Sequence, residues 1–202
     1  MSSARGPRVT TGTLTGTALL LALGIVLPLV FHAFPLGGRV FLPMHLPTFI
    51  AGLVLGPVAG LVVGVGSPVL SALLTGRPPV FYMVPMVFEL GTYGLVAGLL
   101  RPRIASLLSR RSAPPASPET AGGARTSGRA SITAVWLSLL GAMVAGRLVW
   151  IAVVIWLAPV IGIRARTVAM AFAAIGAGWV GMAIQLALIP PLVRAIERLR
   201  NT

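Results

Sequence analysis

The sequence contains no cysteine, no lysine and no aspartate, and it has only three acidic residues, all glutamate. The lack of cysteine excludes disulfides, zinc–thiolate sites and iron–sulfur clusters. The motif G-x-x-x-x-G-K-[ST] is missing, so the chain does not bind ATP through a phosphate-binding loop, and the zinc motif H-E-x-x-H is missing as well. With so few acids and no recognisable Ser–His arrangement, the sequence disfavours an enzyme, a lipid-modifying one included.

Charge of either sign is scarce, because only 9% of the 202 residues are charged whereas 56% are hydrophobic. Soluble domains carry about 25% charged residues and could not bury so much apolar surface. Several uncharged runs approach the ~20 residues that cross a bilayer. The N-terminal run is too long for a signal peptide and lacks a clear cleavage site, so we interpret it as a first span. The sequence predicts a multi-pass membrane protein.

The apolar runs predict an all-α membrane protein with six transmembrane helices in a single domain, residues 1–202. The uncharged stretch 45–75 is too long for one ordinary span. Gly56-Pro57 divides it, because proline starts helices well and disfavours helix in the residue before it. The first of the two pieces is too short to cross fully. The predicted spans are about 13–34, 45–56, 57–75, 80–100, 132–158 and 168–193.

Residues 101–131 carry six arginines among Pro, Ser, Gly and Ala, and this composition predicts a flexible linker. If both termini are cytoplasmic, eleven arginines lie on that side and four lie in the opposite loops, as the positive-inside rule requires. The net charge of +13 sits between apolar runs and at the chain ends and forms no basic face. We therefore expect anionic lipid headgroups as its partner, and no nucleic acid.

Two charged residues lie within spans. Glu89 is nine residues into the fourth span, and Arg147 is eleven residues from the outer end of the fifth. At ~1.5 Å per residue both lie near mid-depth. Such a charge costs ~2.5–3.5 kcal/mol on insertion scales, so each must face a partner or a wet cavity. Two compatible interpretations remain open: a structural Glu89–Arg147 ion pair, or Arg147 at the floor of a solute pocket, where it binds a ligand carboxylate or carbonyl.

Aromatic residues accompany these charges at helical spacing. Tyr93 follows Glu89 by four residues and Trp150 follows Arg147 by three, so each shares a helix face with its charged neighbour. Both are candidates for pocket lining, with plain packing as the alternative. His45 opens the second helix and is a further candidate ligand-binding residue, although a histidine at a helix end is more often a polar anchor. No metal site and no cofactor are predicted.

In the first span, Ala18 and Ala22 are separated by three residues, and a small-xxx-small pair lets another helix approach closely. The alternative for this pair is internal packing within the monomer.

The stretch HLPTFIAGLVLGPVAGLVVGVGSPVLSALLTGRPP, followed by FELGTYGLVAGLL, resembles the substrate-binding S components of energy-coupling factor (ECF) vitamin transporters. The similarity covers most of residues 13–100 and includes the H-x-P start, the LGP-x-x-G break and the GL-x-AGLL ending. The second half is similar mainly in layout, through two further spans after a basic linker.

The resemblance implies a six-helix fold with cytoplasmic termini in a bacterial-type inner membrane. It implies capture of a water-soluble vitamin or related micronutrient from outside, and assembly with a transmembrane T component and two ATPase subunits. It also implies that Ala18 and Ala22 pack on the T component. If Arg147 meets the ligand, an anionic compound such as pantothenate or a folate-like molecule is favoured over cationic thiamine.

Two alternative functions remain open. A stand-alone solute facilitator would need a continuous polar path, and the sequence offers only scattered polar residues. A membrane scaffold would dock its partner on the arginine-rich linker.

Overall fold

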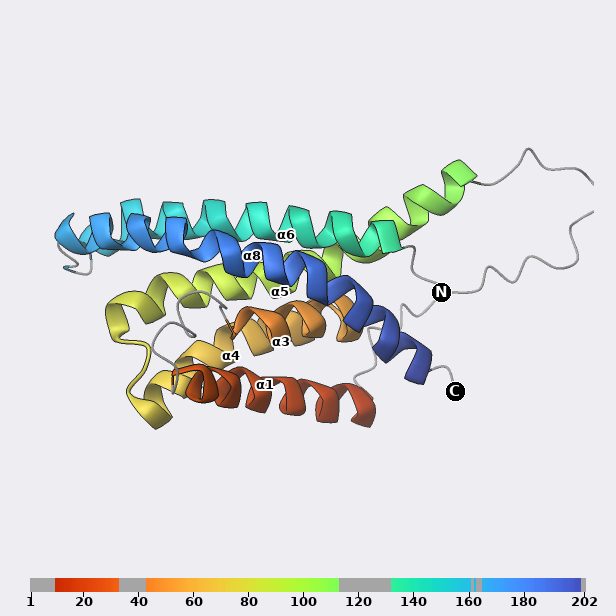
Figure 1. The fold of residues 1–202 in the computed structure, drawn as a ribbon, viewed down its shortest axis with the longest axis horizontal. Helices are drawn as coiled ribbons and strands as arrows, with labels where there is room; N and C mark the ends of the chain where they lie inside the picture. The colour runs from red at the N-terminus through yellow and green to blue at the C-terminus, as the bar shows by residue number, and fades with distance from the viewer. Residues whose placement is uncertain (1–9, 33–42, 113–131, 161, 163–164, 201–202) are drawn as a thin grey trace, which may run out of the picture.

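The computed structural model describes residues 10–32, 43–112, 132–160, 162 and 165–200. Within these ranges the chain is helical apart from short connections and contains no strand, which confirms the predicted all-α membrane class. The helices lie side by side in one elongated bundle (Figure 1). In chain order they are α1 (Thr11–His32), α3 (His45–Ile50) with its π-helical continuation η1 (Ala51–Leu55), α4 (Pro57–Thr75), α5 (Val80–Ser112), α6 (Ile132–Ala152) with η3 (Val153–Leu157) and α7 (Ala158–Val160), and α8 (Ala165–Arg200).

Five of these helical passes are long and apolar enough to cross a membrane, and the pass formed by α3 and η1 is not. It covers only His45–Leu55, which at ~1.5 Å per residue reaches about half of the ~30 Å hydrocarbon core. The sequence had predicted that this pass, the first of the two pieces of 45–75, is too short to cross fully. The start of α1 and the end of α8 lie at the same end of the bundle (Figure 1).

The break between η1 and α4 falls at Gly56-Pro57, as the sequence predicted. Gly56 has φ 107°, a conformation that residues with a side chain rarely adopt, and Pro57 occupies the first turn of α4. The Gly56 amide donates to the carbonyls of Ala51 and Gly52 at 3.1 and 3.2 Å. The chain therefore reverses direction sharply here, and α4 returns alongside η1.

Three passes meet backbone to backbone at a glycine seam formed by Gly52 in η1, Gly60 and Gly64 in α4, and Gly94 in α5. An ideal Cβ on Gly94 would lie 2.1 Å from the Gly60 carbonyl oxygen, and one on Gly52 would lie 2.3 Å from the Gly94 oxygen. A Cβ on Gly64 would lie 2.3 Å from the carbonyl oxygen of Leu90. No side chain fits at these positions, so η1, α4 and α5 form the tightly packed centre of the bundle.

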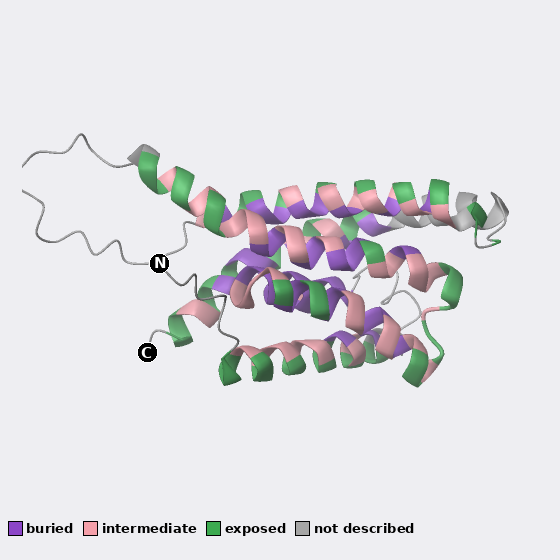
Figure 2. Cartoon of the chain, turned by 180° about the vertical axis from the view of Figure 1, so that it is seen from behind, coloured by how far each residue is buried: buried purple, intermediate pink, exposed green. Residues whose placement is uncertain are grey.

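Helix α1 lies at the edge of the bundle and keeps most of its surface exposed, as the green and pink segments in Figure 2 show. It contacts α4 closely at Gly24, where an ideal Cβ would lie 2.2 Å from Ser67 Oγ. Near its start, Gly16 faces the side chain of Leu55 at the end of η1. Since α1 touches the core through a narrow strip, most of its residues are left to face lipid or another protein.

The predicted start of the flexible linker at residue 101 is wrong, because α5 continues to Ser112. Pro102 had marked the boundary, since proline removes one helical hydrogen bond. The residues after it are mostly Ala, Leu, Arg and Ile, and most of these favour helix strongly enough to carry it through. This part of α5 projects beyond the other helices (Figure 1). The rest of the predicted linker, 113–131, lies outside the described residues.

Candidate functional site

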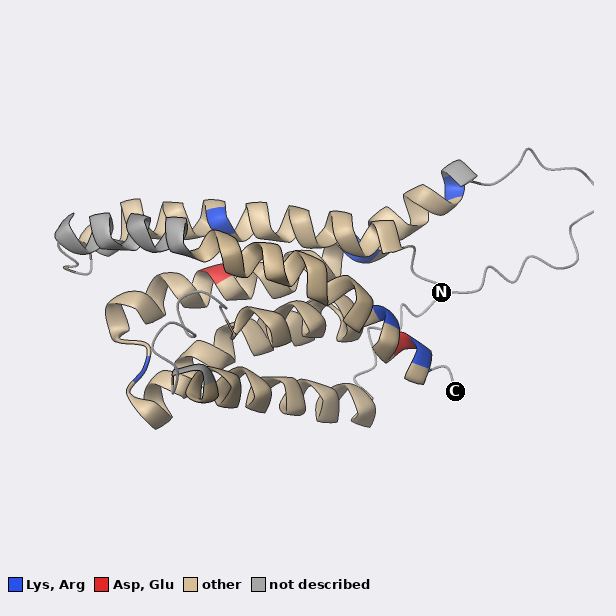
Figure 3. Cartoon of the chain, in the orientation of Figure 1, with Lys and Arg blue, Asp and Glu red and all other residues tan. Residues whose placement is uncertain are grey.

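The two intramembrane charges meet between α5 and α6. Arg147 Nη1 lies 3.1 Å from Glu89 Oε1, and Glu89 is only 5% exposed. Figure 3 shows one acidic segment on α5 near one basic segment on α6, inside the bundle and away from the other coloured segments. The ion pair that the sequence offered as one interpretation is therefore present. A pair at this depth satisfies two charges that lipid could not solvate.

Tyr93 completes the carboxylate's contacts. Its hydroxyl donates to Glu89 Oε1 at 2.7 Å, and the whole residue is 1% exposed. The two residues are one helical turn apart on α5, so the backbone itself brings them together, as their spacing predicted. Both the tyrosine and the arginine bond to the same oxygen of Glu89, Oε1.

The short helix α3 packs its first turns against this tyrosine. The rings of His45 and Tyr93 are 5.4 Å apart and inclined by 50°, and the ring of Phe49 stacks on Tyr93 at 4.9 Å. His45, Phe49 and Tyr93 are all buried. Such offset aromatic contacts hold the tyrosine ring in one position, so α3 fixes the direction in which the hydroxyl points.

Gly146 explains how α6 comes close enough to deliver Arg147. An ideal Cβ on Gly146 would lie 2.3 Å from two carbon atoms of the Tyr93 ring and 3.0 Å from the Glu89 carbonyl oxygen. This residue was not predicted from the sequence. The available signal was a glycine directly before the one arginine that lies within a span.

The far side of the Arg147 guanidinium faces α8. Nη2 donates to Met182 Sδ at 3.4 Å, and a thioether sulfur is a weak acceptor. The Nε atom is buried and has no hydrogen-bond acceptor among the described residues. Among the described residues, Arg147 therefore has one strong partner, Glu89, while the Nε–Nη2 edge of its guanidinium meets the Met182 sulfur.

Trp150 is buried one turn beyond Arg147, where it packs with Val154 and Ile151 in a small cluster of its own. The structure thus assembles four of the five predicted ligand-binding residues into one polar and aromatic network. We call these four residues, Arg147, Glu89, Tyr93 and His45, the buried network. Trp150 lies beside the buried network and makes none of the contacts described for it.

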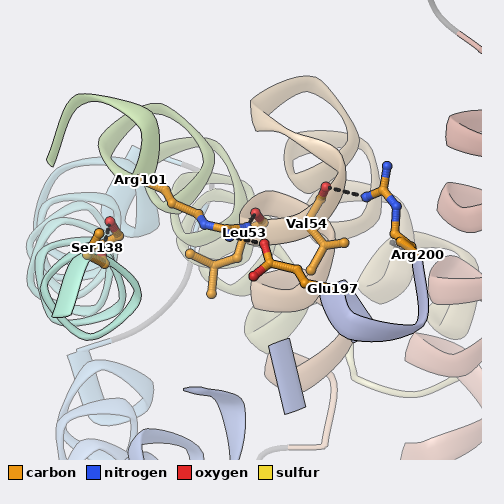
Figure 4. Close-up of polar contacts among 7 residues, drawn as sticks. Leu53, Val54, Arg101, Ser138, Glu197 and Arg200 are labelled. Carbon is orange, nitrogen blue, oxygen red and sulfur yellow. Dashed lines mark hydrogen bonds and ion pairs between the residues drawn. The ribbon is translucent and has the colours of Figure 1, made fainter. Parts of the chain in front are cut away.

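A second polar cluster lies at the end of the bundle where α8 finishes (Figure 4). Arg101 of α5 bonds to the carbonyl oxygen of Leu53 and pairs with Glu197 of α8. Arg200 donates to the carbonyl oxygen of Val54 at 3.2 Å. Both carbonyls belong to the last turn of η1, whose final carbonyls have no helical partner. We call Arg101, Glu197 and Arg200 the end cap; the sequence had placed these residues in the linker and the tail.

Ala18 and Ala22 are both exposed on the outer side of α1. The pair therefore contributes little to packing within the described part of the chain. Within the described part of the chain, no group of three or more His, Cys, Asp or Glu side chains is arranged to hold a metal ion.

The helical bundle and the buried network show that the chain is a multi-pass α-helical membrane protein with a polar network in its interior. A comparison with protein families identifies the family. Residues 12–193 match the model of the substrate-specific component of ECF transporters, and the chain belongs to this family. It is therefore a substrate-capturing transport subunit, as its resemblance had predicted. No curated protein and no solved structure matches the chain.

Proposed function

We propose that the chain captures a water-soluble vitamin or a related micronutrient and passes it inward through an importer driven by a T component and two ATPase subunits. Both termini face the cytoplasm of a bacterial-type cell, on the side that carries eleven of the arginines. The observation that carries this proposal is the buried network, in which Glu89 is paired with Arg147 and hydrogen-bonded to Tyr93 in the middle of the bundle.

Burying an ion pair costs desolvation free energy, whereas small residues could join the same two helices by packing alone. The pair is useful where a polar solute has to be recognised inside lipid, because it provides fixed donors and acceptors there. The Nε–Nη2 edge of Arg147 is set to bind a ligand oxygen, and the aromatic rings of Tyr93 and Phe49 provide apolar contact beside it. This combination suits a small heterocyclic or otherwise amphipathic solute.

The energy for uptake comes from elsewhere, since the sequence has no phosphate-binding loop. The exposed Ala18 and Ala22 on α1 provide a face where a helix of the T component can approach closely. This docking face lies on the outer side of α1, whereas the buried network is formed by α3, α5 and α6.

Reconstitution in liposomes tests the proposal, with a panel of labelled water-soluble vitamins as probes. We expect the chain alone to retain one vitamin without accumulating it in the lumen. Accumulation should appear only when the T component, both ATPases and ATP are all present. Entry of the vitamin into the lumen through the lone chain, down its gradient and without ATP, would contradict the proposal and favour a facilitator.

The scaffold alternative is tested in the same liposomes by deleting residues 113–131. We expect vitamin retention to be unchanged, because the buried network lies in α3, α5 and α6, outside this segment. Loss of retention on this deletion, with the rest of the bundle still folded, would contradict a capture role for the buried network.

A further inference from the structure

The buried network contains one positive and one negative side chain among the described residues, and they are already paired with each other. Arg147 Nη1 contacts Glu89 Oε1 at 3.1 Å, with side-chain exposures of 19% and 6%. The two charges cancel, so the ion pair brings no net charge to the site before any solute arrives. In a low-dielectric interior a solute that adds a charge of either sign leaves that charge uncompensated, which is costly.

The contacts inside the buried network also show which atoms a solute can reach. The Nη1 side of the guanidinium is held by Glu89, whereas Nη2 has only Met182 Sδ at 3.4 Å and Nε has no acceptor among the described residues. In any guanidinium the Nε and Nη2 hydrogens point along one edge and can bind a single oxygen or a pair of oxygens. Methionine is flexible, so its side chain can move aside when a better acceptor arrives.

We infer that the substrate is a solute without net charge whose carbonyl-type oxygen, such as that of an amide, ureido or ring-lactam group, binds the Nε–Nη2 edge of Arg147 in place of Met182 Sδ. The inference rests on the proposed capture function and makes it more specific. It replaces the expectation of an anionic vitamin, which followed from the charge of Arg147 and left out the charge of Glu89. Glu89 sets this charge preference by neutralising the arginine, and Met182 covers the ligand-binding edge in the empty site.

The first test needs no variant. The chain is purified from cells grown in rich medium, the bound small molecule is released by denaturation, and its formula is determined by mass spectrometry. We expect a molecule that is uncharged or zwitterionic at pH 7 and contains a carbonyl outside any carboxylate. A captured molecule with a net charge would overturn this inference but leave the capture function standing. Capture of no molecule at all, here and in the vitamin panel, would overturn the capture function and the inference with it.

The second test measures charge preference with matched probes: nicotinamide against nicotinate, pantothenol against pantothenate, and biotinamide against biotin. For whichever pair binds, we expect the uncharged member to bind at least ~10-fold more tightly, because the acid brings an uncompensated charge. In Glu89→Gln the arginine loses its counter-charge, so the preference should move by ~10-fold or more toward the acid. Glutamine keeps the shape of the side chain and an oxygen for the Tyr93 hydroxyl.

Glu197→Gln is the matched control, because it removes the same charge from the end cap at the far end of α8 and should leave the preference unchanged. An acid that binds wild-type protein more tightly than its uncharged partner would overturn the inference. An unchanged preference in Glu89→Gln would overturn it too. If none of the three probe pairs binds, the net charge of the molecule extracted in the first test supports or overturns the inference.

Discussion

At the scale of single residues, we expect Arg147 both to neutralise Glu89 in the fold and to bind the solute, and substitution can separate these two roles. Arg147→Met leaves the buried Glu89 carboxylate unpaired, so we expect a loss of ~3–5 kcal/mol in stability. In the double variant Arg147→Met with Glu89→Gln no buried charge is left, and stability should largely recover while solute binding stays absent. Thermal unfolding in detergent, measured together with vitamin binding, checks both expectations.

Recovery of binding together with stability in the double variant would show that the pair serves the structure alone. A single variant as stable as wild type would show instead that Glu89 finds another partner when the arginine is removed.

Gly146 is the residue that permits the contact between α6 and Tyr93. Gly146→Ala places a methyl group where only 2.3 Å separates it from the tyrosine ring, so we expect ~1–3 kcal/mol of destabilisation and weaker solute binding. Gly141→Ala is the control on the same helix, since its added Cβ meets only a terminal methyl of Leu100. Thermal unfolding and binding titrations should show a clearly larger effect at Gly146. Equal effects would mean that the approach to Tyr93 is not what requires glycine.

At the scale of elements, the short pass made of α3 and η1 is held at both ends. His45 and Phe49 pack on Tyr93 at one end, and the end cap bonds to the last carbonyls of η1 at the other. Arg101→Met removes the bond to the Leu53 carbonyl and the ion pair with Glu197, so we expect a loss of ~1–3 kcal/mol.

Hydrogen exchange checks this expectation, since amides in the last turn of η1 and at Gly56 should exchange faster in Arg101→Met. Arg103→Met is the control, because Arg103 is exposed two residues further along α5. Faster exchange in both variants would point to general loosening of α5.

The sequence predicted the elements wherever the signal was local. Gly56-Pro57 marks the break before α4 because glycine and proline act on their own backbone, and apolar runs mark the spans because lipid demands them. The end of α5 was mispredicted, because Pro102 signals a boundary whereas the helix-favouring residues after it continue the helix. The end cap could not be predicted, since Arg101 and Glu197 lie 96 residues apart.

The buried network was partly predictable, because some of its signals are also local in the sequence. Glu89 and Tyr93 share one face by spacing alone, and depth in the membrane singled out Arg147. Their meeting across α5 and α6 was one of two interpretations, because a sequence gives depth along a helix but not which faces pack together. Met182 carried no signal in the sequence, and the only signal for Gly146 was its place directly before Arg147, in a chain that has 24 glycines.

At the scale of the whole molecule, we expect capture and docking on the T component to use different faces. Ala18→Trp adds a bulky ring on the exposed side of α1, so we expect ligand binding to stay within ~2-fold of wild type and uptake with the T component and ATPases to be lost. Leu19→Trp is the control, at a neighbouring position that is 66% exposed on another part of the helix surface. Liposome uptake and binding titrations separate the two effects. Lost binding in Ala18→Trp would place this face within the fold's own packing.

The glycine seam has a consequence for how a solute can enter. Where η1, α4 and α5 touch main chain to main chain, there is no layer of side chains that could slide or change rotamer. These three passes must therefore move as one rigid body. We therefore expect opening and closing around the substrate to fall to the outer helices α1, α6 and α8, while the inner block keeps its shape throughout transport.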